Sequence, residues 1–197
     1  MIIHDYRKKY RSLYQVKTGR IEVVEIPPLQ FITQKGIGRL NEIGRPEADV
    51  SAIWKTVNQL KRISKERYHV QFKLMPIETV WHEHFAEEEW SYTNMMQVPD
   101  FIDMEMYEEA TANVRKGNSH DTFTGTKLVT VHQGRCIHKL HEGHYRDTNR
   151  TLEELYKYAD DHEMELNEGR REVYINQPGC NPPERWKSIV RVQVRIT

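Results

Sequence analysis

The sequence has few cysteines, no excess of either charge and no long hydrophobic run. Its 197 residues include two cysteines, Cys136 and Cys180. One disulfide is arithmetically possible, but nothing else in the sequence indicates secretion, so a cytoplasmic protein with two free thiols is the better interpretation. The 29 basic residues balance the 29 acidic ones. This balance argues against a protein built mainly to bind the phosphate backbone of nucleic acids, which needs a basic surface.

The sequence also lacks membrane and nucleotide-binding signals. No apolar run approaches the roughly 20 residues that a helix needs to span a bilayer, and the N-terminal residues lack the apolar core of a signal peptide. We find no phosphate-binding loop, nucleophile elbow, dinucleotide fingerprint or helix-turn-helix in the sequence. We therefore expect a cytoplasmic protein that contacts neither nucleic acid nor membrane directly and that carries no cofactor.

The first half of the chain predicts an arm followed by strands and helices. Residues 1–18 are polar, basic and rich in tyrosine, which indicates an arm packed on the surface. Alternating apolar residues, helical spacing and proline or glycine breaks place the elements that follow. They begin with a strand over about 20–34, bent at Pro27-Pro28, a loop from Gly36 to Pro46 and a helix over Pro46–Arg62. Two strands follow over about 69–82 and 89–98, joined by the acidic stretch Glu83–Glu89. A second helix then carries Ile102, Met106, Ala110 and Val114, with Asp100 or Asp103 as its cap.

The second half repeats this order of elements. It predicts strands over about 126–145 with a break at Gln133-Gly134, a helix over Thr151–Glu163 opened by a capping box, a strand over 171–176 and a final strand around Val190–Ile196. Each half therefore gives strand, helix, strand, strand. This predicts an α+β fold of duplicated β-α-β-β units related by a pseudo-twofold. We expect a single domain over 19–197, with repeats over about 19–117 and 118–197 and a central ligand cleft between the halves.

The strand at residues 171–176 carries the most informative pair of side chains. Alternation places Val173 and Ile175 on one face, and Glu172 and Tyr174 on the other. A carboxylate on the inner face of a sheet is costly unless a partner meets it. One interpretation is a ligand pocket around Glu172. The other is a structural salt bridge, for which the sequence offers Arg170, Arg171 and Arg191 as candidate partners.

Several aromatic side chains are candidates for the walls of such a pocket, because flat ligands stack on aromatic rings. From their spacing alone, these residues are equally typical of a hydrophobic core, and Trp54 is assigned to the core because it lies on the apolar face of a helix. Methionine suits an adaptable pocket, and one of the neighbours Met95 and Met96 can face it. The candidate wall residues are Trp81, Trp90, Phe101, Tyr145, Tyr174 and Met96.

The histidines suggest a metal site that the sequence does not complete. His82 and His84 share one strand face, whereas His138, His141 and His144 do not, because their spacing of three differs from the period of a strand. No cysteine or carboxylate completes a zinc pattern, so we expect no metal. His141, close to Tyr145 in the chain, is a candidate for the border of the cleft.

Six stretches together carry a resemblance that covers nearly the whole chain. The stretches are Leu13-Tyr-Gln15, Val24-Glu-Ile-Pro27 with Gly36-Ile-Gly38, Met75-Pro-Ile-Glu-Thr-Val-Trp81, Trp90-Ser-Tyr-Thr-Asn-Met-Met-Gln-Val-Pro99, Leu140-His-Glu-Gly-His-Tyr145, and Glu172-Val-Tyr-Ile175 followed by Pro183-Glu-Arg-Trp-Lys187. With these stretches in this order, the sequence resembles the GyrI-like small-molecule-binding proteins.

The resemblance implies a fold and a range of activities. The family has a duplicated β-α-β-β fold with a central cleft. Some members are effector domains of multidrug-sensing transcription regulators, in which a buried glutamate meets cationic drugs, and one member inhibits DNA gyrase. Other relatives hydrolyse the cyclopropane ring of flat DNA-alkylating toxins with a glutamate between aromatic walls. Glu172 aligns with that glutamate, while Trp81, Trp90 and Tyr145 resemble the aromatic wall.

We therefore expect a cytoplasmic protein that binds hydrophobic, flat or cationic small molecules. If it is also an enzyme, the resemblance implies a cyclopropyl hydrolase in which Glu172 activates water, and Tyr145 or Tyr174 hydrogen-bonds the developing oxyanion. Two alternatives stay open. One is a protein-interaction module such as a gyrase modulator, which predicts an exposed patch, and the other is an effector module of a separate regulator. The sequence does not predict the oligomeric state.

Overall fold

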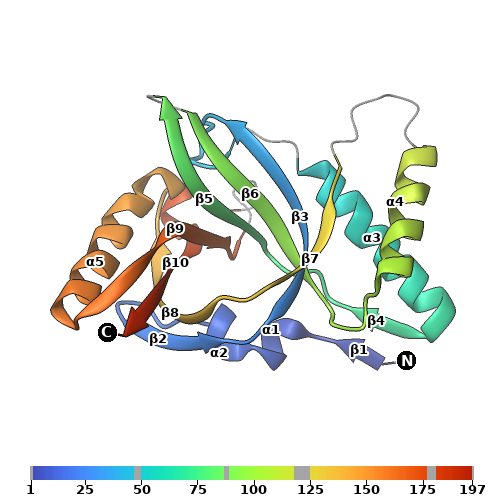
Figure 1. Ribbon diagram of the computed structural model, residues 1–197, viewed down its shortest axis with the longest axis horizontal. Coiled ribbons are helices and arrows are strands. Elements are labelled where there is room, and N and C mark those ends of the chain that lie inside the picture. Colours follow the sequence, from blue (N-terminus) through green and yellow to red (C-terminus); the bar gives the residue numbers. More distant parts are fainter. Residues whose placement is uncertain (1, 47–49, 87–88, 118–124, 177–180, 197) are drawn as a thin grey trace.

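The computed structural model describes residues 2–46, 50–86, 89–117, 125–176 and 181–196, and it has the expected α+β fold (Figure 1). The helices are α1 (Tyr6–Lys9), α2 (Arg11–Tyr14), α3 (Ser51–Tyr68), α4 (Met104–Gly117), α5 (Thr148–Asp161) and the short 3-10 turns η1 (Tyr145–Asp147) and η3 (Pro183–Arg185). The strands are β1 (Ile2–His4), β2 (Ile21–Ile26), β3 (Leu29–Gly38), β4 (Val70–Phe72), β5 (Ile77–Ala86), β6 (Glu89–Val98), β7 (Lys127–Val131), β8 (Gly134–Glu142), β9 (Met164–Tyr174) and β10 (Lys187–Ile196).

One large sheet organises the molecule. Its eight strands run in the order β2-β8-β10-β9-β5-β6-β3-β7 with antiparallel neighbours, while β1 pairs with β4 in a small parallel sheet. In Figure 1 the sheet twists between α5 at one end and α3 with α4 at the other. None of the described helices is long and apolar enough to cross a membrane.

The order of strands is symmetric about the central pair of β5 and β9. On one side β3, α3, β5 and β6 follow one another in the chain, and on the other side β8, α5, β9 and β10 do the same. In both cases the last two strands pair with each other, and the final strand pairs back onto the first. The repeated element order expected from the sequence is therefore present, whereas superposition of the halves about a pseudo-twofold stays a prediction.

The first long helix differs from the prediction at both ends. It runs over Ser51–Tyr68 instead of Pro46–Arg62. Pro46 forms an isolated bridge with Leu40 instead of opening the helix. The apolar stripe continues to the buried Ile63, so the helix extends until His69, which adopts a left-handed conformation with φ 53° and ends it.

The helix of the second half also begins earlier than the capping box indicated. It runs over Thr148–Asp161 instead of Thr151–Glu163. Thr151 lies inside the helix, where it is buried, and its hydroxyl contacts His141 Nδ1 at 2.9 Å. The N-cap prediction for Thr151 is therefore wrong, because its hydroxyl contacts His141 in the interior instead of capping the start of the helix. In α4, by contrast, Asp103 caps as predicted and accepts a hydrogen bond from the Met106 amide at 2.8 Å.

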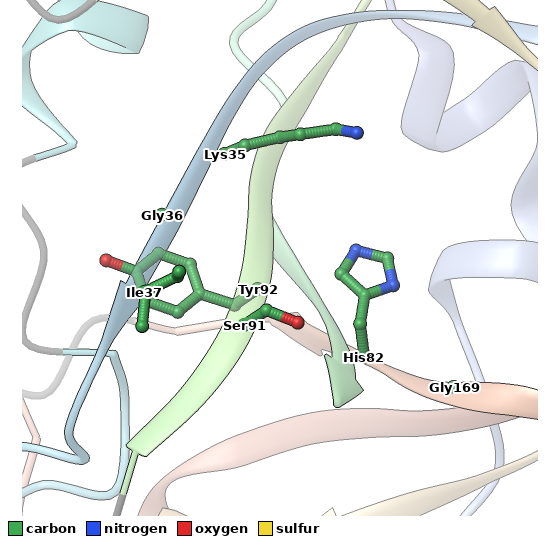
Figure 2. A pocket seen from close by; sticks show the side chains of 7 residues that line it. All are labelled: Lys35, Gly36, Ile37, His82, Ser91, Tyr92 and Gly169. Carbon is green, nitrogen blue, oxygen red and sulfur yellow. The ribbon is translucent and has the colours of Figure 1, made fainter. Parts of the chain in front are cut away.

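Two strand predictions also need correction. Residues 69–82 do not form one strand, because the segment before Pro76 separates β4 from β5. Gly36 and Gly38 belong to β3 and not to the following loop. Figure 2 shows why glycine suits this strand, since the Tyr92 ring lies across Gly36. A Cβ atom at Gly36 would come within 2.5 Å of the Tyr92 hydroxyl.

The N-terminal segment packs into the main hydrophobic core. Tyr6, Leu13 and Tyr14 are buried in the same cluster as the apolar residues of α3 and the central strands. A second cluster lies between α5 and the sheet and includes Leu155 and Val190. The proposed division into an arm and a domain stays a prediction.

Candidate ligand-binding site

The candidate site is built on the centre of the sheet, where β9 pairs with β5. Arg170, Glu172 and Tyr174 alternate along β9 and therefore lie on one face. Across the strand pair, Arg170 stands opposite Trp81, and Glu172 stands opposite Thr79. Residues directly opposite in a sheet project to the same side, so the sheet brings these side chains together. We call this side, on which α5 packs, the helix face.

Glu172 is buried and only partly satisfied. Its side chain is 1% exposed, and its Oε2 atom accepts a hydrogen bond from the Tyr174 hydroxyl at 3.0 Å. Its Oε1 atom lies 3.4 Å from Arg170 Nε, but the two atoms are not aligned for a hydrogen bond, and both lack another partner. The salt bridge that the sequence left open is thus present, with Arg170 as the partner.

Arg170 lies between the carboxylate and two tryptophans. Its guanidinium is 5.7 Å from the Trp81 ring and 5.8 Å from the Trp90 ring, within the range of cation–π attraction. Its Nη1 group donates to Asn149 Oδ1 on α5. The rings of Trp81 and Trp90 meet edge to face at 6.1 Å. Trp81 is buried, and its Nε1 group has no hydrogen-bond partner.

A small hollow opens beside this group. We call it the indole hollow; it has a volume of about 140 Å³. It is too small for a drug-sized molecule, since ligand pockets usually measure about 300–1,000 Å³. Its lining includes Trp81, Trp90, Leu152, Tyr156 and Arg170.

A larger hollow lies at the other end of the same row, beside Tyr174. We call it the tyrosine hollow; its volume of about 630 Å³ falls within the usual range for ligand pockets. The Arg45 guanidinium lies 4.4 Å from the centre of the Tyr174 ring. The lining of this hollow includes Arg7, Ile43, Arg45, Trp54, Ile77 and Tyr174.

Tyr174 and Tyr145 remain protonated at neutral pH. Burial, followed by the charge of Glu172, raises the pKa of Tyr174 well above its ordinary value. Burial also raises the pKa of Tyr145 to about 12. The two rings lie 4.9 Å apart, and the Tyr145 hydroxyl donates to the Asn176 carbonyl at 2.7 Å. Tyr174 is therefore the phenol that already contacts Glu172.

The loop before α3 holds Arg45 over the site. Arg146 donates from Nε to the Glu42 carbonyl and from Nη2 to the Asn41 carbonyl, each at 2.9 Å. Gly44 has a φ of 80°, and a Cβ atom there would lie 2.5 Å from the Arg146 backbone nitrogen. The loop and η1 thus approach each other closely, and Arg45 is fixed above Tyr174. Arg45 has no signal in the sequence that would reveal this role.

The structure does not bring all predicted wall residues together. Trp81 and Trp90 lie beside Arg170, whereas Tyr145 lies at the other end of the row, between Tyr174 and Trp186. The remaining candidates lie elsewhere. Phe101 packs against His4 and Phe72 close to the N-terminal segment, Met96 is fully buried in the core, and His141 is held between Thr151 and the His144 carbonyl.

A second buried polar group lies on the opposite face of the sheet. Glu78 accepts hydrogen bonds from Arg171 at 2.9 Å and from Tyr14 at 3.0 Å. Arg191 donates to the Leu13 carbonyl at 2.8 Å. Arg171 and Arg191 are therefore not the partners of Glu172, which corrects two of the three candidates from the sequence.

His138 belongs to the same buried region as Arg191, which it faces across the strand pair of β8 and β10. Burial, followed by the charge of Arg191, lowers the pKa of His138 to about 3. Glu22 lies 3.7 Å from its Nε2 atom and would act in the opposite direction, but Glu22 is partly exposed. We therefore describe His138 as a neutral buried histidine.

The described residues contain no group of three or more His, Cys, Asp or Glu side chains that could hold a metal ion. His82 is exposed and contacts the Thr93 hydroxyl at 2.9 Å, while the side chain of His84 lies outside the described part of the chain. Cys136 is buried as a free thiol, and Cys180 also lies outside the described residues. The expected absence of a metal is a prediction for elemental analysis.

A third hollow lies on the face opposite to Glu172. We call it the sheet hollow; it measures about 770 Å³. Figure 2 shows Lys35 and His82 reaching to one side of the strands, away from the Tyr92 ring. None of the candidate site residues is among its described lining, which comes mostly from β3 and β6 and includes the exposed side chains of Lys35 and Ile37.

Solved structures share this fold at low sequence identity. A hydrolase encoded by lin2189 from Listeria innocua matches with a TM-score of 0.85 and 21% identity over 99% of this chain and 100% of its own. The C-terminal domain of EcmrR matches with a TM-score of 0.53 and 14% identity over 90% and 98%. No curated protein sequence matches the chain. At such identities the likeness shows the fold alone.

The family predicted from the six sequence stretches is confirmed. A family model described as the GyrI-like small molecule binding domain matches residues 20–195, which is most of the chain. The chain therefore belongs to the family of GyrI-like small-molecule-binding domains.

Proposed function

We propose that this protein binds a flat, apolar small molecule in the tyrosine hollow, with the Tyr174 ring as the inner wall. The observation that carries this proposal is the size and lining of the hollow. Its volume of about 630 Å³ suits a small organic molecule. Ile43 and Ile77 supply apolar walls, and Trp54 supplies an aromatic ring for stacking, while the Arg45 guanidinium lies over the Tyr174 ring.

The buried polar row that begins at Tyr174 supports a ligand site over a simple core. A buried polar atom that lacks a hydrogen-bond partner is costly to keep in a fold. Glu172 Oε1, Arg170 Nε and Trp81 Nε1 are three such atoms, of which Arg170 and Trp81 line the indole hollow and not the tyrosine hollow. Clusters of this kind are typical of sites at which a ligand or an ordered water completes the hydrogen bonds.

Binding of a flat fluorescent probe such as 9-anthracenemethanol tests the proposal. Replacing Trp54 by leucine removes the aromatic wall of the hollow, and we expect the Kd to rise by about tenfold, which corresponds to about 1.4 kcal/mol. The control is Tyr68→Leu on the same helix, where the side chain is 52% exposed. The proposal fails if the probe does not bind, or if Trp54→Leu and Tyr68→Leu bind it as the wild type does.

Hydrolysis is a second candidate function, which the position of Glu172 favours. In the proposed reaction, Glu172 takes a proton from water while the water oxygen attacks a carbon of a strained cyclopropane. The ring carbon–carbon bond breaks, and its electron pair moves into a conjugated carbonyl, whose oxygen then takes up a proton. Glu172 Oε1 accepts no hydrogen bond in the structure, although it is paired with Arg170, and so it has a lone pair for a proton; the Listeria innocua protein of the same fold is described as a hydrolase.

Turnover of a spirocyclopropyl dienone, measured by absorbance, tests this second candidate. Glu172→Gln is expected to lower kcat by roughly 10²-fold or more while a flat probe still binds. Equal turnover by wild type and variant would exclude Glu172 as the base. The roles as a gyrase modulator or as an effector of a separate regulator, and the cytoplasmic location, remain predictions from the sequence. Pull-down of a partner would test these roles.

A further inference from the structure

We infer that the N-terminal segment completes the tyrosine hollow as a site for amphipathic anions, in which Arg7 and Arg45 hold the negatively charged group of the ligand. This inference rests on the proposed binding function and adds the chemical class of the ligand. Arg7 lies on α1, outside residues 20–195, which match the family model. The segment before the matched region therefore contributes a residue that determines specificity.

The two arginines line the hollow without a carboxylate to pair with. Arg7 comes from α1 and Arg45 from the loop before α3. Among the described residues, no carboxylate pairs with either guanidinium, and none of those that line the hollow is acidic. A guanidinium stays charged in proteins. Arg45 is half-buried and has already lost part of its hydration, which an anion in the hollow would replace.

Arg45 is held in a position from which it can bind an oxyanion. Its guanidinium lies 4.4 Å from the centre of the Tyr174 ring, and Arg146 fixes the loop that carries it. A guanidinium that lies over an aromatic ring keeps N–H groups at its edge for a ligand. Two such groups can donate parallel hydrogen bonds to one carboxylate, sulfonate or phosphate.

Contacts of the N-terminal segment place Arg7 at the hollow. Tyr6 is buried in the main hydrophobic core, and Asp5 pairs with Lys73 at 2.9 Å. Lys73 directly precedes residues 74–76, which line the hollow. The residues before Arg7 are thus fixed against the wall of the hollow, while the Arg7 side chain itself is exposed and can reach a bound ligand.

The acidic groups near the hollow do not offset these two charges. Glu172 is 1% exposed and is already paired with Arg170. Glu42, in the same loop as Arg45, lines a separate hollow beside Arg146. A ligand anion in the tyrosine hollow would therefore meet two cations and, among the described lining residues, no carboxylate.

The lining combines this charge with apolar walls. Ile43, Ile77 and Trp54 line the same hollow as the two arginines. Its volume of about 630 Å³ leaves room for a ring system together with a charged group. The ligand class that fits is therefore a ring compound with a sulfonate, phosphate or carboxylate group.

Two fluorescent probes that share their ring systems test the inference by titration. 1-Anilinonaphthalene-8-sulfonate carries an anion, and N-phenyl-1-naphthylamine is its neutral counterpart. We expect Arg45→Gln and Arg7→Gln each to raise the Kd of the sulfonate by about tenfold and to leave the Kd of the neutral probe within about twofold. The matched control Arg11→Gln, which removes an exposed arginine of the same segment outside the described lining, should change neither Kd. Added salt should weaken binding of the sulfonate only.

The other outcomes separate this inference from the proposed function. If the neutral probe binds, but Arg45→Gln and Arg7→Gln affect the sulfonate no more than Arg11→Gln does, the inference is wrong while small-molecule binding stands. Equal weakening of both probes would also contradict the inference, because the arginines would then shape the hollow without holding a charge. If neither probe binds the wild type, the proposed function fails and the inference fails with it.

Arg45→Lys separates the charge of Arg45 from its packing. It keeps the positive charge, so we expect it to bind the sulfonate more tightly than Arg45→Gln does. Equal loss in the two variants would argue against an electrostatic role of Arg45. Should Arg45→Gln not fold, Arg7→Gln at an exposed position still decides whether the hollow holds an anion.

Discussion

Replacing Glu172 by glutamine tests how the fold and the site depend on one carboxylate. The change keeps shape and volume but leaves Arg170 without its counter-charge. Removing one partner of a buried ion pair typically costs about 3–5 kcal/mol. Arg170 retains two indole rings, each worth about 0.5–2 kcal/mol to a cation, as well as the Asn149 oxygen. We therefore expect the free energy of unfolding to fall by about 1–3 kcal/mol.

The assay is urea unfolding of wild type and Glu172→Gln at neutral pH, in parallel with titration of 9-anthracenemethanol. The matched control is Glu154→Gln on α5, which loses a partly exposed ion pair with Lys139 and should change stability by less than about 1 kcal/mol. An unchanged or higher free energy of unfolding for Glu172→Gln would refute the assignment of Arg170 as its ion-pair partner. Such a result would identify Glu172 as a carboxylate that the fold tolerates only for function.

The remaining predictions concern pH, the thiols and metal content. The pKa of His138 is lowered to about 3 in the fold, so the unfolded state binds more protons below pH 6.5. The free energy of unfolding should thus decrease by up to about 1.4 kcal/mol per pH unit as the pH falls from 6.5 towards 3. Urea unfolding at several pH values measures this slope. His138→Gln should make the slope smaller, whereas the control His162→Gln, which changes an exposed histidine, should not. Burial raises the pKa of Cys136 to about 11; in a Cys180→Ser background its thiol should react with Ellman's reagent only after unfolding, and rapid reaction of the folded protein would contradict this. Elemental analysis should find no stoichiometric zinc or iron, and one metal ion per chain would overturn the prediction.

Periodicity predicted most of the fold because the apolar stripes are strong. The alternation in β10 and the helical spacing of Ile53, Val57 and Leu60 placed their elements correctly. Helix ends were less predictable, since they depend on contacts made far away in the chain. Thr151 has the sequence of an N-cap, but its hydroxyl contacts His141 inside the fold.

The sequence predicted which site residues share a face of β9, but not which residues from distant segments contact them. Alternation along the strand put Glu172 and Tyr174 on one face. It puts Arg170 on the same face, and Arg170 is one of the three partners that the sequence offered for Glu172. Arg45 reaches Tyr174 from a loop that η1 holds in place, and no local pattern encodes such a contact. Trp54 was assigned to the core by its helical spacing, yet it also lines the tyrosine hollow.

A crystal structure of the protein with bound 9-anthracenemethanol tests the proposed binding site most directly. We expect the ring system of the probe to lie in the tyrosine hollow beside Tyr174 and Trp54, with Arg170 still paired to Glu172. A probe bound in the sheet hollow of Figure 2 instead would contradict the proposed function.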